Sequence, residues 1–155
     1  MQKEKYEIIK HQLNFIDFVD SLKGVNEGIL RSPISEGKWS VLEIISHFSS
    51  WDEFVIEKRI PYFFSMHSFL KGPNSETLNE QTIARKRDEK IEVIFGEFLK
   101  NRSDLVLKMK EIPDDLWLVE FKIGQFNLNV YKYFKGLMEH DIHHMEQIKR
   151  AVDNV

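Results

Sequence analysis

The sequence is poor in cysteine, proline and glycine: its 155 residues include no cysteine, four prolines and seven glycines. The lack of cysteine excludes disulfides, thiolate metal ligands and a cysteine nucleophile, which leaves histidines and carboxylates as candidate metal ligands. It also fits a reducing compartment, so we expect a cytoplasmic protein. The few helix-interrupting residues mark boundaries, because Gly24 can stop one helix and Pro61 ends or kinks another.

Long apolar runs and an excess of one charge are also missing. No window approaches the roughly 18 apolar residues of a spanning helix, and the first residues lack the apolar stretch of a signal peptide, so we expect no membrane partner. The 22 Lys and Arg against 25 Asp and Glu give a net charge of −3. No basic face is implied, and we expect no nucleic-acid partner. The length is most simply that of one domain, residues 1–155.

What the sequence has is helical periodicity. Apolar residues recur at helical spacing in four segments: about 3–23, about 40–60, about 77–109 and about 130–151. The third segment is either one long helix or two pieces broken near Asp88. Between the segments, residues 67–76 read as a loop, and residues 111–128 as a connection in which a short strand is one option. Four main helices with mostly short connections predict an all-α helical bundle.

Two capping boxes mark expected helix starts. Ser40 and Glu43 have the spacing at which the Ser hydroxyl accepts from the Glu backbone N–H and the Glu carboxylate reaches back. Thr77 and Glu80 have the same spacing and predict the start of the third helical segment.

Two histidines in the last segment, His140 and His144, carry the strongest functional signal. Four residues on a helix turn through about 400°, so the two imidazoles point the same way. They replace apolar residues in the stripe expected to face the core, where an unsatisfied polar group costs roughly 1–3 kcal/mol. Binding one metal ion would account for both, since His pairs at this spacing are a recognised ligand arrangement.

A third histidine, His47, lies on the second segment among core-facing positions. In a bundle it can meet the His140 and His144 pair, giving three imidazoles and an open metal position. The competing interpretation is that each histidine is an ordinary core or boundary residue. H-E-x-x-H metalloproteases have their catalytic Glu at the position of Asp141, so the sequence does not predict a protease of that class. Asp141 either orients a neighbouring His or faces solvent. His143 should face a helix edge or solvent.

Three motifs resemble the DinB/YfiT-like family. These are Lys38-Trp39-Ser40-Val41-Leu42-Glu43-Ile44-Ile45-Ser46-His47, Asn79-Glu80-Gln81 and His140-Asp141-Ile142-His143-His144-Met145-Glu146-Gln147-Ile148. The resemblance implies an antiparallel four-helix bundle with a long crossover between helices 2 and 3. It implies a divalent metal held by His47, His140 and His144, most often zinc or nickel, with iron and manganese also compatible. It further implies a homodimer.

Two functions therefore stay open at this point. The first is a metal-dependent enzyme acting on a small molecule, either a hydrolase or a thiol S-transferase, because related bundles use low-molecular-weight thiols such as bacillithiol or mycothiol. The second is a non-catalytic metal-binding or stress-related interaction bundle that acts as a dimer. No general base is assigned. Glu43, one turn before His47, is either a carboxylate supporting a metal ligand or simply the capping-box partner.

Overall fold

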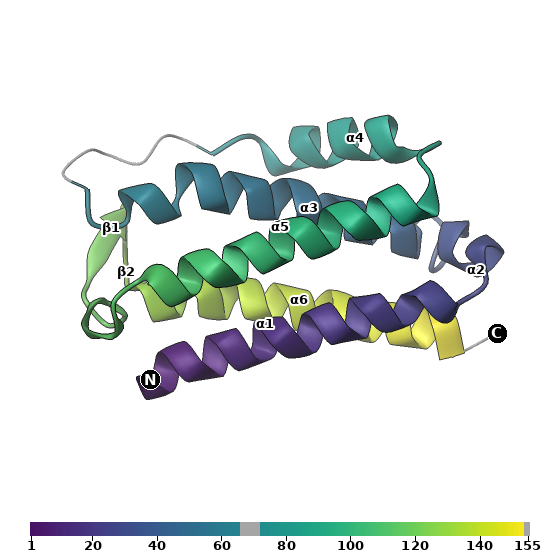
Figure 1. Ribbon diagram of the computed structural model, residues 1–155. Coiled ribbons are helices and arrows are strands. Elements are labelled where there is room, and N and C mark those ends of the chain that lie inside the picture. Colours follow the sequence, from purple (N-terminus) through teal and green to yellow (C-terminus); the bar gives the residue numbers. More distant parts are fainter. Residues whose placement is uncertain (66–71, 154–155) are drawn as a thin grey trace.

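Four long helices form a bundle (Figure 1) in the computed structural model, which describes residues 1–65 and 72–153. They are α1 (Lys3–Ser21), α3 (Val41–Lys58), α5 (Ile91–Glu111) and α6 (Val130–Asp153). Shorter elements connect them: α2 (Glu27–Arg31), α4 (Ser75–Lys86) and an antiparallel hairpin of β1 (Phe121–Ile123) and β2 (Phe126–Leu128). The predicted all-α bundle with a long crossover is confirmed.

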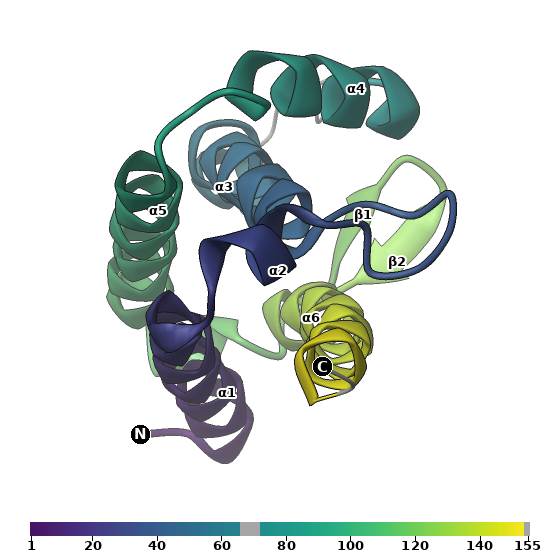
Figure 2. The same cartoon turned by 90° about the vertical axis from the view of Figure 1, so that its right-hand side faces the viewer.

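The crossover decides how the helices run. After α3 the chain returns along the bundle through α4, so that α3 and α5 run in the same direction (Figure 1). Viewed along the bundle, α4 packs outside α3, and α2 lies across one end (Figure 2). The long helices can therefore all project side chains into one interior.

The start of α3 is the predicted one. Ser40 Oγ accepts from the Glu43 backbone N–H at 3.1 Å, and the Ser40 backbone N–H donates to Glu43 Oε1 at 3.2 Å. Glu43 is thus the capping-box partner. These bonds satisfy two of the backbone donors that a helix leaves unpaired at its first turn.

The predicted start of the next helix is wrong. The N-cap of α4 is Asn74, whose Oδ1 accepts from the Thr77 backbone N–H at 3.1 Å, so Thr77 already lies inside the helix. Asn is as good an N-cap as Ser or Thr, and Asn74 has the extended backbone that a cap requires, with φ −61° and ψ 123°. The helices α4 and α5 are separate, as in the alternative that breaks near Asp88. Residues 72–74 lie outside helices as expected; residues 67–71 of that loop prediction fall outside the described residues.

We expect Ser40→Ala to lower the free energy of unfolding by about 1 kcal/mol, because the Glu43 backbone N–H loses its acceptor at the start of α3. The measurement is urea denaturation followed by circular dichroism. Ser35→Ala, the same change at an exposed position outside the helices, is the control and should leave stability unchanged. Equal stability of the two variants would show that the capping box adds nothing.

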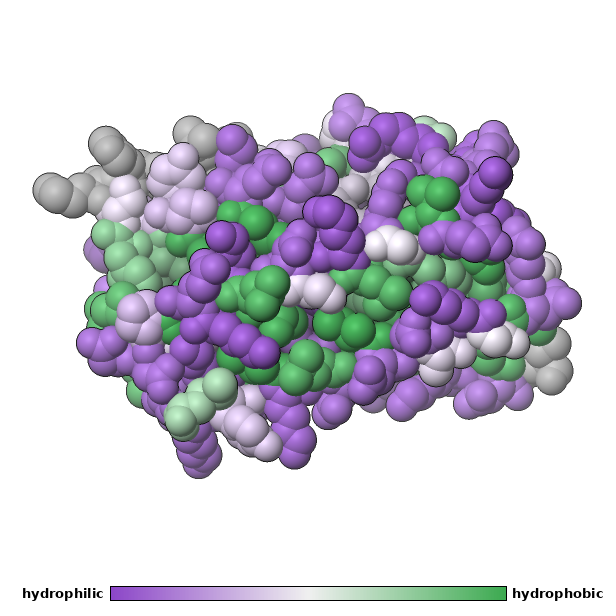
Figure 3. All heavy atoms as spheres, viewed as in Figure 1, coloured by the Kyte–Doolittle hydropathy of each residue, from purple (hydrophilic) through white to green (hydrophobic). Residues whose placement is uncertain are grey.

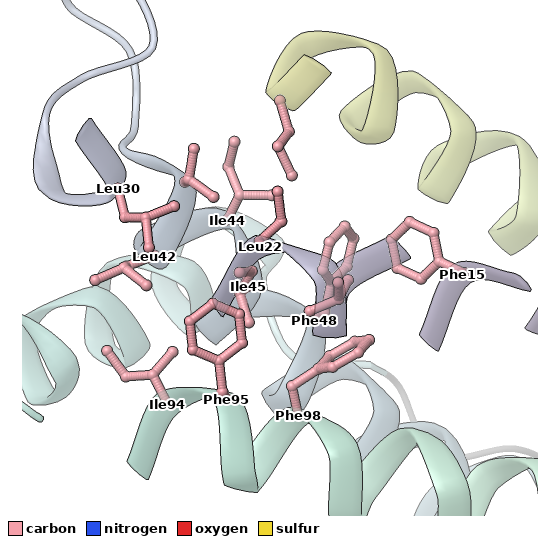
Figure 4. Close-up of a cluster of buried hydrophobic side chains, with 13 residues drawn as sticks. Phe15, Leu22, Leu30, Leu42, Ile44, Ile45, Phe48, Ile94, Phe95 and Phe98 are labelled. Carbon is pink, nitrogen blue, oxygen red and sulfur yellow. The ribbon is translucent and has the colours of Figure 1, made fainter. Parts of the chain in front are cut away.

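The interior contains two apolar clusters. One is rich in phenylalanine and isoleucine and is drawn in Figure 4; it includes Phe15, Phe48 and Phe98. The other fills the opposite end of the bundle around Phe134 and Trp117. Trp117 of the connection after α5 is fully buried at this end, whereas Val119 is 44% exposed.

One polar side chain from each long helix lies between the two clusters. These are Gln12 of α1, Asp52 of α3, Arg102 of α5 and Asp141 of α6, each at most 5% exposed. On every helix the residues before and after this position belong to different apolar clusters. We call these four residues the polar layer.

The surface in Figure 3 carries a band of hydrophobic side chains between hydrophilic ones. Leu13 of α1 and Leu107 of α5 are 46% and 57% exposed. No helix within residues 1–65 and 72–153 combines the length and the apolar character needed to cross a bilayer. The homodimer expected from the family resemblance stays a prediction.

Candidate metal centre

The structure brings the three predicted histidines together. His47 of α3 meets His140 and His144 of α6, and one ring nitrogen from each lies within 4.8 Å of the other two. The Nε2 atoms of His140 and His144 are 3.1 Å apart. The His47 ring centroid lies 5.5 Å from that of His140 and 4.9 Å from that of His144. The three side chains could hold a metal ion.

The burial of the histidines differs from the prediction. His47 is 2% exposed, but His144 is half-buried and His140 is exposed, so the pair does not occupy the core-facing stripe. That stripe passes instead through Met138 and Asp141. The pair lies at its edge, on the side of α6 that faces α3. Because of this offset, an ion at the site would be open to a small molecule from outside.

Hydrogen bonds orient two of the rings. His47 Nδ1 contacts the Ile44 carbonyl oxygen, and His144 Nδ1 lies 2.9 Å from Gln147 Oε1. Both partners are oxygen acceptors, so each Nδ1 carries the proton and each Nε2 keeps a lone pair for a ligand. Histidines that ligate metals commonly donate their second ring nitrogen in this way.

All three imidazoles favour the neutral form. The pKa of His47 is lowered to about 3, mainly by burial and further by the neighbouring His144 and His140, against the opposing effect of the Ile44 carbonyl. Burial, followed by the adjacent His140, lowers the pKa of His144 to about 4. Burial also lowers the pKa of His140. A metal arriving at neutral pH would thus have no proton to displace from these ligands.

The donor set fits a divalent transition metal. Three imidazoles with an open fourth position are a common arrangement for catalytic zinc. At about 2.0–2.1 Å from a tetrahedral ion, two nitrogens are about 3.3 Å apart, close to the 3.1 Å between His140 and His144. His143 is not part of this group of converging ring nitrogens, and its side chain is exposed.

Arg102 is the centre of the polar layer beside this site. Its Nε donates to Asp52 Oδ2 at 2.7 Å, and its Nη1 donates to Asp141 Oδ2 at 2.8 Å and to Gln12 Oε1 at 3.0 Å. His11 Nε2 lies 2.9 Å from the same Asp141 oxygen. Phenylalanine rings surround the guanidinium, with centroids at 5.1–5.5 Å for Phe15, Phe48 and Phe98.

Sequence reasoning missed this network. Of the two alternatives for Asp141, facing solvent is wrong, because the side chain is buried and paired with Arg102. Asp141 does contact a histidine, but that residue is His11 of α1 and not one beside it in the sequence. No role was predicted for His11 from the sequence. One signal was present, since Asp52 and Arg102 interrupt apolar helical stripes, and a buried charge needs a partner.

The two carboxylates of the polar layer differ electrostatically. Burial raises the pKa of Asp52 to about 6 against the attraction of Arg102. Burial also tends to raise the pKa of Asp141. The charge of Arg102 and the hydrogen bonds from His11 and Arg102 outweigh that effect, so the pKa of Asp141 is lowered. Asp52 is therefore the carboxylate that gains or loses a proton near neutral pH.

A cavity of about 710 Å³ adjoins the histidines. His140, Asp52, Asp141 and Arg102 line its polar end. Most of the remaining lining is apolar or aromatic and comes from α3, α5, α6 and the hairpin, including Trp51, Phe54, Leu105, Ile123, Leu128, Tyr133 and Leu137. Its size suits a drug-sized small molecule. His140 thus borders both the candidate metal centre and a partly open space for a ligand.

Comparisons with known proteins support the fold. No protein-family model and no curated protein matches this sequence. Among solved structures, the chain is similar to YfiT from Bacillus subtilis, described as a probable metal-dependent hydrolase with an unusual four-helix bundle topology. The TM-score is 0.79 at 11% identity, covering 99% of this chain and 89% of that one. At this identity the likeness shows the fold, and at that level the resemblance to the DinB/YfiT-like family is confirmed.

Proposed function

We propose that this protein is a metal-dependent hydrolase that binds one divalent ion through His47, His140 and His144. The observation that carries the proposal is the convergence of three neutral imidazoles at the edge of a cavity large enough for a small-molecule substrate. YfiT, whose fold the chain shares, is described as a probable metal-dependent hydrolase. Zinc is our first choice of ion because it favours imidazole ligands and needs no redox partner; nickel is the second.

The metal would supply a Lewis acid for a carbonyl group and a water of lowered pKa. The chain's own residues have separate tasks. The Ile44 carbonyl and Gln147 hold the His47 and His144 rings in the tautomer that exposes Nε2. The largely apolar cavity wall would replace part of the water around a bound substrate. Asp52 lines the same cavity as His140, and a carboxyl with a pKa of about 6 can take up or release a proton at neutral pH.

The first test is the metal content of the untagged protein by plasma mass spectrometry. We expect about one equivalent in the wild type and none in His144→Ala, which leaves two imidazoles. His143→Ala removes an exposed histidine next in sequence and is the matched control; it should keep the metal. A wild type that stays empty after incubation with zinc and with nickel would contradict the proposal and favour a non-catalytic interaction bundle.

The second test separates reaction classes. The metal-loaded protein is assayed with aryl esters and with a thiol cosubstrate plus an electrophile. Hydrolysis that disappears in His144→Ala and persists in His143→Ala supports the hydrolase. Turnover that requires the thiol would identify an S-transferase instead, with the thiol coming from a cosubstrate because the chain has no cysteine. Metal binding without either activity would favour the non-catalytic alternative.

A further inference from the structure

We infer that the cavity binds a neutral aromatic compound whose N–H or O–H group donates a hydrogen bond to Asp52 beside His140. That this compound is the substrate class rests on the proposed function; that the cavity binds it does not, because the argument uses the lining residues alone. Three features of the lining carry the inference: its aromatic wall, its balanced charge and one carboxylate oxygen with no protein partner.

The wall is aromatic and held in place. Trp51 and Phe54 meet edge to face, with ring centroids 5.6 Å apart, and the Trp51 indole N–H donates to Asn79 Oδ1 at 2.9 Å. Tyr133 contributes a third ring from α6 and Phe126 a fourth from β2. Such rings favour flat apolar ligands that can stack or pack edge to face.

The part of the lining formed by described residues carries no net charge. Asp52 and Asp141 are balanced by Arg59 and Arg102, and these four are the formally charged residues among the described residues that line the cavity. Each arginine is already engaged: Arg102 with both carboxylates, and Arg59 with the Phe54 ring, whose centroid is 4.7 Å from its Cζ. In the metal-free protein, a charged ligand would meet no unpaired opposite charge among these residues while losing its hydration, so a neutral one is favoured.

One acceptor remains for the ligand. Asp52 uses Oδ2 to accept from Arg102, and its Oδ1 has no hydrogen bond within the described part of the chain. Every fully buried side-chain nitrogen or oxygen in that part has a partner, so Asp52 Oδ1 is not fully buried. Because Asp52 lines the cavity, we take this partly accessible oxygen as the acceptor that a ligand would meet. An ionised carboxylate only accepts, and a ligand must therefore bring the donor.

The probe for this inference is N-phenyl-1-naphthylamine, a neutral two-ring-system compound with one N–H whose fluorescence rises in apolar surroundings. It is titrated into chelator-treated protein at pH 7.5. We expect saturable binding of one molecule. The anionic analogue 8-anilino-1-naphthalenesulfonate should bind at least about tenfold more weakly, because the cavity offers its charge no unpaired cation. Equal or tighter binding of the anion would overturn the inference.

Variants locate the binding site. Leu137→Trp places a larger ring in the cavity and should weaken probe binding by about tenfold or more. Leu107→Trp, on an exposed face of α5, is the matched control and should leave it unchanged. Asp52→Asn replaces the ionised acceptor and should weaken binding by about tenfold while the anion's affinity rises or stays equal. If Leu137→Trp binds the probe as wild type does, the cavity is not the site and the inference fails.

The metal content of the same wild-type sample keeps the two proposals apart. Probe binding in a protein that takes up no metal would support the cavity as a ligand site and would contradict the proposal of a metal-dependent hydrolase. One equivalent of metal in a protein that does not bind the probe would remove only the inference about the ligand.

Discussion

Arg102→Met is expected to lower the free energy of unfolding by about 3–5 kcal/mol at pH 7, the range for removing one partner of a buried ion pair. The side chain is 3% exposed and is the cation shared by Asp52 and Asp141. Methionine keeps much of the volume among the three phenylalanine rings, so the loss reflects two unpaired carboxylates more than a cavity. Urea denaturation of both proteins measures it.

The pH dependence identifies the cause. A carboxyl whose folded pKa is raised adds stability at low pH and loses it as pH rises through that pKa. In the wild type, Asp52 is such a carboxyl, because burial raises its pKa to about 6. In Arg102→Met, the pKa of Asp141 should also rise, because the arginine that lowers it is gone. The gap between Arg102→Met and wild type should therefore narrow as pH falls from 7 to 5. Arg150→Met, at an exposed position, is the control; a gap that stays constant over this pH range would show that packing dominates.

Zinc is expected to stabilise the folded wild type by about 2.7 kcal/mol when free zinc is one hundred times its dissociation constant. The reason is linkage: His47 and the α6 pair lie on different helices, and the unfolded chain does not hold them within 4.8 Å. Thermal unfolding with and without zinc gives the shift in Tm.

The matched variants make this result specific. His144→Ala should lose the zinc-dependent shift, and His143→Ala should keep it, although both remove one imidazole from the same turn of α6. An equal shift in both variants would mean that zinc binds elsewhere on the chain. A shift that survives in His144→Ala and disappears in His143→Ala would mean that the ligand set is wrong.

The helices were largely predictable because their signals are local. The capping box at Ser40 and the apolar periodicity predicted the position of α3. The same periodicity predicted α6, with an end within two residues of the observed one. The start of α4 was misplaced because Asn74 and Thr77 both have capping chemistry, and only the folded backbone chooses between them. The hairpin strands are three residues each, too short for a clear alternating pattern.

The convergence of His47, His140 and His144 could be predicted because the spacing of two residues on one helix fixes their common direction. Their exposure could not. A rotation of α6 that places Asp141 toward Arg102 moves the histidine pair to the edge of the core, and that rotation is set by contacts with α1, α3 and α5.

The sequence by itself determined where the long helices lie, that they form a bundle, and that His140 and His144 share one helix face, since periodicity and capping act over a few residues. Only the tertiary structure decided the polar layer, because its members pair across 39 to 90 residues of chain and each alone looks like a misplaced charge or amide in an apolar stripe. It also decided the cavity beside His140, whose walls come from separate helices and the hairpin. Burial imposes these pairings, because a charge removed from water is stable in the interior only when partners from other helices surround it.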